Sequence, residues 1–195
     1  MSPIYPLDVP RHRRPRALVL TGLLYGKDQE RDRAHSLLEP LLGAPACAGP
    51  VRPFDYTDYY EPEMGAALRR EYLAFQRLLS PEHLVGLKHE TSKVEEALAQ
   101  GGKRRVNIDP GYVDINKVVL ASWKEGLYKV YLGERVWGDP VAHFFEKAFH
   151  AEAWTFPDIA SGEHFEFFKR ARVFYKSLLK KFRDGMSVEH YIPRR

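Results

Sequence analysis

The apolar run Ala17–Tyr25 (ALVLTGLLY) constrains the fold of this chain more than any other segment. Its length and its branched aliphatic side chains predict a buried β-strand. A helical pattern follows, because Ala and Leu side chains recur at helical spacing over residues 34–42, with Asp28 as the expected N-cap. Pro40 should bend or end that helix early. The ordered part of the chain is therefore expected to begin with a β-α pair.

The Gly26-Lys27 turn between these two elements is laid out like a loop that cradles phosphate. A Walker A loop requires G-x-x-x-x-G-K-[ST], whereas Gly22 and Gly26 are separated by only three residues and Lys27 is followed by Asp28. That carboxylate would repel a triphosphate at the position where the motif has its metal-binding hydroxyl. We therefore interpret the segment as a strand, a turn and a helix N-terminus.

Three further elements are predicted in the middle of the chain. Alternating side chains over residues 54–59 indicate a second strand that ends before Pro62, and a helical stripe of apolar residues starts after Gly65. Ser80 and Pro81 then have the residue types of an N-cap and a first helical position, so a third helix is expected from there to the Gly101-Gly102 pair. The second stripe consists of Leu68, Tyr72, Phe75 and Leu79, and the third of Leu84, Leu87, Thr91, Val94 and Leu98.

The remaining sequence predicts more strands and a closing helix. Residues 103–114 (KRRVNIDPGYVD) indicate a third strand closed by a Pro-Gly turn, and residues 115–123 fit a short helix or a strand equally well. Residues 127–145 and 148–154 alternate as antiparallel strands, and residues 165–182 form a long amphipathic helix. This order predicts an α+β fold, with a mixed or mostly antiparallel sheet and helices packed on one face. We expect a loosely ordered basic arm at 1–16, a single domain at 17–184 and a tail at 185–195.

Composition limits the cellular setting and the available chemistry. The chain has 195 residues and is 44% hydrophobic, which is enough for a real core, but no stretch approaches the roughly 18 uninterrupted apolar residues of a membrane span. The single cysteine, Cys47, excludes an intramolecular disulfide and a cysteine-rich metal site. These features predict a cytoplasmic protein with no membrane partner.

The formal charge of +4 is unevenly distributed along the chain. Residues 1–16 carry +3 and residues 169–195 carry +7, which leaves −6 for the remainder. Basic termini of this kind attract nucleic acid or acidic proteins, but they are also typical of a solvated surface.

Polar side chains on two of the predicted strands form the main candidate site. Asp55, Thr57 and Tyr59 should share one face of the second strand, and Arg105, Asn107 and Asp109 one face of the third. If these strands are neighbours, guanidinium, amide, carboxylate and tyrosine groups meet in one place, which is the composition of a polar-ligand site. The alternative is a set of mutually neutralising pairs on an exposed sheet.

Two smaller clusters are also candidates. Lys88, with Thr91 or Ser92 and with Glu95, lies on one helix face, where it would offer a cation and a hydroxyl to an anion, or simply form an ordinary helix flank. A two-residue turn at Glu146-Lys147 would place His143 opposite His150 and Phe144 opposite Phe149, with Glu152 nearby as a third metal ligand. Glu-Lys is a poor choice for such a turn, and the chain has no H-E-x-x-H or G-x-S-x-G motif, so we predict no metal site.

Four separated motifs, PFDYTDYYEPEMG, KRRVNIDPGYVD with KVVLAS, YLGERVW and WTFPD, resemble the prokaryotic family catalogued as domain of unknown function 4416. The resemblance extends from about Leu18 to Arg172 and implies an intracellular bacterial or archaeal protein. It implies little chemistry, although some members carry an automatic label of GTP-binding, for which this chain has no recognised motif. The YGKD turn departs from the family pattern. The motif positions that carry over are Asp55, Thr57, Tyr59, Tyr60, Glu63, Arg104, Arg105, Asn107, Asp109, Gly111, Tyr112, Trp154 and Asp158.

These observations favour binding of a small anionic ligand such as a nucleotide. The expected ligand-binding residues are Asp55, Thr57, Tyr59, Tyr60, Arg104, Arg105, Asn107, Asp109 and Tyr112. One alternative is binding of nucleic acid or a ribonucleoprotein through the basic termini, chiefly the C-terminal helix. Another is a metal-assisted hydrolase with Asp55 or Asp109 as its base. The sequence identifies no catalytic residue and no cofactor.

Overall fold

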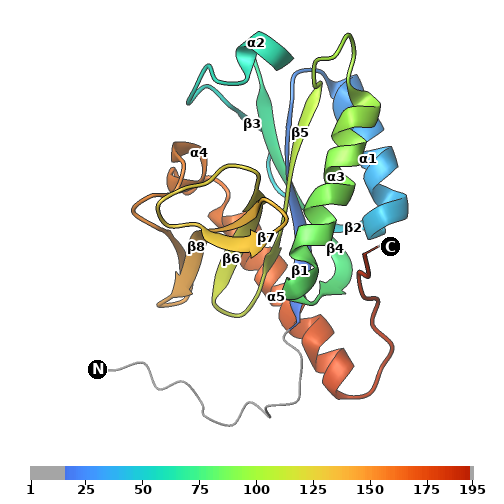
Figure 1. Cartoon of the computed structure of the whole chain (residues 1–195). Coiled ribbons are helices and arrows are strands. Elements are labelled where there is room, and N and C mark those ends of the chain that lie inside the picture. Colours follow the sequence, from blue (N-terminus) through green and yellow to red (C-terminus); the bar gives the residue numbers. More distant parts are fainter. Residues whose placement is uncertain (1–15, 194–195) are drawn as a thin grey trace.

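The computed structural model describes residues 16–193, so the predicted arm at 1–16 lies, apart from Arg16, outside the described residues. Its elements are arranged around one sheet (Figure 1). In chain order they are β1 (Ala17–Tyr25), α1 (Asp28–Leu42), β2 (Pro45–Ala48), β3 (Arg52–Pro53), α2 (Glu61–Met64), β4 (Arg69–Leu79), the 3₁₀ turn η1 (Pro81–His83), α3 (Leu84–Leu98), β5 (Val106–Val113), β6 (Lys117–Ser122), β7 (Val130–Gly133), β8 (Val136–Phe145), β9 (Ala148–Ala151), α4 (Pro157–Ala160) and α5 (Phe165–Arg183).

The strands of the described residues form one nine-stranded sheet in the order β2-β4-β1-β5-β6-β8-β7, with β3 added to β4 and β9 to β8. Every pairing between these strands is antiparallel. Strand β1 lies near the middle, and all of its residues are buried, as the apolar run predicts. The α+β class, the antiparallel sheet and the long C-terminal helix are therefore confirmed.

Helices cover both faces of this sheet rather than one (Figure 1). Val19 and Leu23 of β1 pack in the core that includes α1 and α3, whereas Leu18 and Leu20 pack in the core that includes α5. Successive side chains of a strand point to opposite faces, so a strand that is apolar at every position has two faces to bury. Helix α5 meets that requirement on the second face.

The helix expected after Gly65 is in fact strand β4, and that prediction was wrong. The residues of the supposed stripe, such as Tyr72 and Phe75, are buried, but so are Leu73 and Ala74 between them. A strand buried on both faces shows no alternation and cannot be distinguished from a buried helix by periodicity. The sequence pattern therefore could not identify this central strand.

The second strand predicted at residues 54–59 is a loop, which is a further correction. Only Phe54 is buried there, and Thr57 Oγ1 accepts a hydrogen bond from the backbone N–H of Tyr59 at 3.1 Å. This local bond closes a turn, and the segment continues into the single turn of α2. The acidic and aromatic side chains of the segment thus lie on a loop at one end of the sheet.

Two prolines also behave differently from the prediction. Pro40 lies in the last turn of α1, which continues to Leu42 and ends at Gly43. Pro110 and Gly111 lie inside β5, where a turn was expected. Proline is tolerated in a strand where no partner strand needs its missing N–H, and the pairing of β5 with β6 starts only at Gly111.

The segment that follows α5 packs against the sheet. The backbone N–H of Leu78 donates to Glu189 and that of Tyr191 donates to the carbonyl of Leu78, both at 2.9 Å. Tyr191 is buried, and its hydroxyl donates to the carboxylate of Glu90 on α3. The described part of the predicted tail is therefore bound along β4.

Candidate functional site

A fork in the sheet creates the site. Strands β5 and β6 pair only from Gly111 to Val113 and diverge on the side of Ile108. Two side chains of α3 take the place of the missing strand there. Lys88 Nζ donates to the carbonyl of Ile108 at 2.9 Å, and the backbone N–H of Ile108 donates to a carboxylate oxygen of Glu95 at 2.5 Å. Lys88 and Glu95 are seven residues apart, which is two helical turns, so both face the same strand.

A cavity of about 560 Å³ lies at this fork. Its walls come from β4, β5, β6 and β8, the loop that precedes α2, the loop that follows β6, and α4. The lining residues are Phe54, Tyr56, Thr57, Tyr59, Tyr60, Arg70, Tyr72, Lys88, Arg104, Asn107, Asp109, Leu120, Ala121, Ser122, Trp123, Lys124, Lys129, Asp139, Val141, Phe156, Pro157, Asp158 and Ile159.

A buried ion-pair network forms one wall. Arg70 Nη1 lies 3.2 Å from Asp109 and Arg70 Nε lies 3.4 Å from Asp158, while Lys88 Nζ lies 3.6 Å from the other oxygen of Asp109. Asn107 adds a hydrogen bond to Asp109 at 2.9 Å. Arg70, Lys88 and Asp158 are buried, whereas the side chain of Asp109 is 24% exposed, and each charge has a partner, as buried charges require.

The same contacts determine the protonation of the two acids. Burial acts to raise the pKa of Asp109, but the charges of Lys88 and Arg70 and the hydrogen bonds to it outweigh burial and lower that pKa. Asp158 lies near the same guanidinium, yet burial raises its pKa. Asp109 is therefore held as a carboxylate, whereas Asp158 takes up a proton more readily than an exposed aspartate.

Arg104 is fixed at the open side of this network. Its Nε and Nη2 donate to the two oxygens of Glu63 at 2.8 and 2.7 Å, and its Nη1 donates to Asn107 at 2.9 Å. These hydrogen bonds lower the pKa of Glu63. A two-point contact between guanidinium and carboxylate fixes orientation as well as charge, so Arg104 and Asn107 are pre-positioned beside the cavity.

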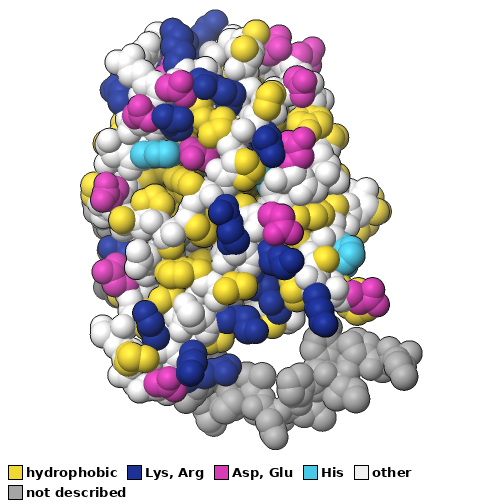
Figure 2. Space-filling view, turned by 180° about the vertical axis from the view of Figure 1, so that it is seen from behind, with side chains coloured by type: hydrophobic (Ala, Val, Ile, Leu, Met, Phe, Trp, Pro, Cys, Tyr) yellow, Lys and Arg dark blue, Asp and Glu magenta, His cyan; other side chains and the backbone are white. Residues whose placement is uncertain are grey.

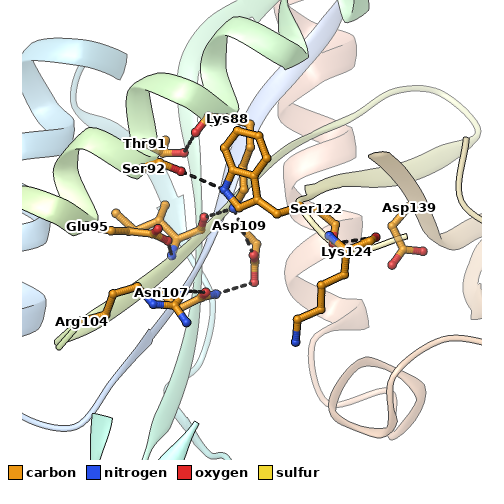
Figure 3. Close-up of polar contacts among 12 residues, drawn as sticks. Lys88, Thr91, Ser92, Glu95, Arg104, Asn107, Asp109, Ser122, Lys124 and Asp139 are labelled. Atoms are coloured by element: carbon orange, nitrogen blue, oxygen red, sulfur yellow. Dashed lines mark hydrogen bonds and ion pairs between the residues drawn. The ribbon is translucent and has the colours of Figure 1, made fainter. Parts of the chain in front are cut away.

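The opposite wall carries a second ion pair. Lys129 Nζ lies 3.2 Å from Asp139 and donates to Ser122 at 3.1 Å. Burial raises the pKa of Asp139, and Lys129 partly opposes this effect. Figure 3 shows Asp139 and Lys124 across the site from Arg104, Asn107 and Asp109.

Aromatic side chains surround the mouth of the cavity. Tyr59 is 55% exposed, and Lys124 Nζ lies 3.2 Å from the centroid of its ring, a cation–π contact between two loops. Burial raises the pKa of Tyr60 to about 12, so its hydroxyl keeps its proton. Trp123 donates its indole N–H to Ser92 of α3 at 3.1 Å.

The cavity as a whole favours negative charge. Five cationic side chains and three carboxylates line it, an excess of two positive charges. Among the described residues, Lys124 differs from the other four cations because no carboxylate forms an ion pair with it. An incoming anion would therefore find Lys124 free of competing acids.

Six of the nine residues expected from the sequence line this cavity: Thr57, Tyr59, Tyr60, Arg104, Asn107 and Asp109. The other three do not. Asp55 is exposed on the loop, and Arg105 precedes β5 outside the lining. Tyr112 packs in the core of the other sheet face, with Val19.

Several lining residues could not be derived from strand alternation. Arg70 and Tyr72 lie in the segment interpreted as a helix, Lys129 lies in the loop before β7, and Asp139 lies on β8 opposite Leu120 of β6. Lys88 was marked by its helix face, and Asp158 by the WTFPD motif. For Arg70 no sequence signal was available, because its role depends on which strand β4 pairs with.

The other candidate clusters are more ordinary. The β8–β9 turn has two residues with positive φ, Glu146 and Lys147, so His143 does pair with His150 as the two-residue turn required. His143 contacts Glu152 at 2.8 Å, but in the described part of the chain no group of three or more His, Cys, Asp or Glu side chains is arranged to hold a metal ion.

Helix α5 carries the basic surface expected near the C-terminus. The side chains of Lys169, Arg170, Lys176, Lys180, Lys181 and Arg183 are exposed. Figure 2 shows Lys and Arg side chains both at the upper end and over the lower half of this face. Among the helices of residues 16–193, none combines the length and the apolar character needed to cross a membrane.

Comparison with known proteins gives one match. The family model described as domain of unknown function (DUF4416) matches residues 15–175, which include every residue that lines the cavity. No curated protein and no solved structure matches the chain significantly.

Proposed function

The chain belongs to the DUF4416 family, and from its cavity we propose that it binds a small anionic ligand such as a nucleotide. The proposal depends on one observation: five cationic side chains and several exposed aromatic side chains line the same cavity. Phosphate oxygens require the former, and a planar base stacks on the latter.

Cavity size supports a ligand of this class. Sites for small molecules and cofactors typically enclose about 300–1,000 Å³ and combine apolar walls with a few positioned polar groups. A volume of about 560 Å³ lies inside that range. The walls supply Leu120, Val141 and Ile159 as apolar surface beside the polar network.

Each polar group has a role in this proposal. Lys124 binds phosphate oxygens because it has no carboxylate partner among the described residues. Asn107 and Asp109 accept from ligand hydroxyl or amino groups, and Tyr60 donates its phenolic hydrogen. Tyr59 loses its contact with Lys124 when the lysine turns to the anion, and it stacks on the ligand ring.

Calorimetric titration of the full chain with adenosine and guanosine phosphates and with inorganic phosphate tests the proposal. We expect binding by at least one nucleotide, weakened about tenfold in Lys124→Ala, since a charge-assisted hydrogen bond contributes roughly 1.5–3 kcal/mol. Lys93→Ala is the matched control, because Lys93 is an exposed lysine of α3 that does not line the cavity. If no nucleotide binds at millimolar concentration, the proposal is wrong.

The exposed cations of α5 favour a second candidate, binding of nucleic acid on that helix face. It predicts affinity that falls steeply with salt and that is lost when Lys176, Lys180 and Lys181 are replaced together by Ser. The same triple variant should leave binding of mononucleotides unchanged. This comparison separates the helix surface from the cavity.

A cytoplasmic, prokaryotic setting is part of the same proposal. The single thiol, Cys47, is half-buried, and burial raises its pKa, so it remains a protonated thiol at neutral pH. A chain without disulfide capacity suits a reducing compartment.

A further inference from the structure

An exposed aromatic pair lies on the two loops that supply Lys129 and Phe156 to the cavity. Tyr128 and Trp154 stack on each other with ring centroids 4.1 Å apart and ring planes inclined by 18°. Their side chains remain 51% and 39% exposed. Neither lines the cavity, but Lys129 and Phe156, which are close to them in the chain, both do.

The stacked pair is held in place from the side of the sheet. The indole N–H of Trp154 donates to the carbonyl of Pro140 on β8 at 3.3 Å, and Thr155 donates its hydroxyl to Val141 at 2.8 Å. Lys129 Nζ lies 5.7 Å from the ring centroid of Phe156, which connects the loop of Tyr128 to the loop of Trp154. A flat and preformed aromatic pair thus lies next to two residues that line the cavity, Lys129 and Phe156.

We propose that the nucleotide in the cavity is the terminal residue of a single-stranded nucleic acid, and that the next base stacks on the Tyr128–Trp154 pair. This inference rests on the proposed function of the cavity. Sites for single strands combine positive charge along the backbone with aromatic rings for successive bases. Both parts are present here, because Lys124 and Phe156 line the cavity and the stacked pair lies on the same loops as the lining residues Lys129 and Phe156.

Charge favours nucleic acid over a protein partner at this surface. A protein interface needs apolar rings but no nearby excess of cations, whereas a phosphodiester chain needs both. The cavity mouth supplies Lys124, which forms no ion pair with a carboxylate in residues 16–193. Stacking tolerates any base, so we expect little sequence preference at the outer position.

The test compares adenosine 5′-monophosphate, its 5′-phosphorylated dinucleotide and a five-residue oligoadenylate by calorimetry or fluorescence anisotropy. We expect the dinucleotide to bind at least fivefold more tightly than the mononucleotide, which matches the known contribution of one stacked base. Trp154→Ala should remove that gain and change mononucleotide affinity less than twofold. Phe145→Ala, which removes another exposed ring outside the cavity lining, should change neither.

Each other outcome decides the question. If the mononucleotide binds but the dinucleotide gains nothing, this inference is wrong and the proposed function stands. If neither binds, both are wrong. Tyr128→Leu on the neighbouring loop replaces Trp154→Ala if circular dichroism shows that the latter unfolds. Self-association that Trp154→Ala abolishes, without any effect on dinucleotide binding, would assign the surface to a second copy of the chain and overturn the inference.

Discussion

Lys88 Nζ lies 3.6 Å from Asp109 and donates a hydrogen bond to the carbonyl of Ile108 at 2.9 Å, so one ammonium group joins helix α3 to strand β5 and to the cavity. The side chain of Lys88 is only 2% exposed. Burial of a lysine is costly unless its charge and its hydrogen bonds are satisfied, and here Asp109 and Ile108 satisfy both. Lys88 therefore lines the cavity and also stabilises the packing of α3 against β5.

Lys88→Met should destabilise the protein by about 3 kcal/mol, the lower end of the range for breaking a buried ion pair. The lower end applies because Asp109 keeps Arg70 and Asn107 as partners. Urea denaturation at pH 7 measures the change. Lys93→Met on the exposed side of the same helix should cost less than about 0.5 kcal/mol, and equal losses in the two variants would contradict the role of Lys88.

Glu95 should make stability fall as pH rises. Burial raises its pKa from 4.5 to about 7, so below pH 4.5 the acid is protonated in both states, and above it the unfolded chain ionises first. The loss develops from about pH 4.5 through 7 and amounts to something on the order of 3 kcal/mol. Glu95→Gln keeps an acceptor for Ile108 and should remove this dependence. Denaturation curves at pH 4.5, 6 and 8 would show parallel pH slopes for the two proteins if the prediction is wrong.

His164 should act in the opposite direction. Burial, with the charges of Arg70 and Arg52, lowers its pKa to about 4, and its ring packs edge-on against Tyr72 with centroids 4.7 Å apart. As pH falls below 6.5, His164 becomes protonated in the unfolded chain but stays neutral in the folded one, so the stability of the fold decreases until about pH 4. His164→Phe keeps an aromatic ring, and relative to its own value at pH 7 it should retain about 2 kcal/mol more than the unaltered protein at pH 5. If the two proteins lose the same unfolding free energy between pH 7 and pH 5, His164 is protonated in the folded state and the prediction is wrong.

Gly111→Ala tests the fork directly. A Cβ there would overlap the carbonyl oxygen of Val119 and lie 2.8 Å from Leu120 Cδ2. Backbone cannot move aside as a flexible side chain does, so we expect a loss of roughly 3 kcal/mol or more and weaker ligand binding. Gly126→Ala, which meets only the flexible side chain of Lys129 at 3.1 Å, is the control. Thermal melts of equal midpoint for the two variants would rule out the tight approach of β5 to β6.

Parts of the fold that depend on local pattern were predictable from the sequence. The apolar run gives β1, the helical stripe gives α3, although the helix ends at Leu98 before the Gly101-Gly102 pair, and alternation in β5 correctly separates Asn107 and Asp109 from Val106 and Ile108. Even the His143–His150 pairing follows from a two-residue turn.

The parts that depend on neighbours were not predictable. Strand β4 is buried on both faces because helices cover both sides of the sheet, and no local sequence pattern shows this. Arg70 was missed with it. The two predicted sets of residues do line the same cavity, but Thr57, Tyr59 and Tyr60 lie on a loop and not on the strand next to β5 that we expected. The residues therefore meet although the predicted geometry was wrong.

The fork between β5 and β6 separates the residues that support the fold from the loops that complete the cavity. The inner walls come from strands whose pairing stops at Gly111 and from α3, which bonds to Ile108, whereas the segments before α2, after β6 and before α4 line the rest of the cavity. Insertions or exchanges in those three loops would reshape that part of the cavity and leave the hydrogen-bonded frame intact. Ligand preference in such an architecture can differ between relatives with little loss of folding stability.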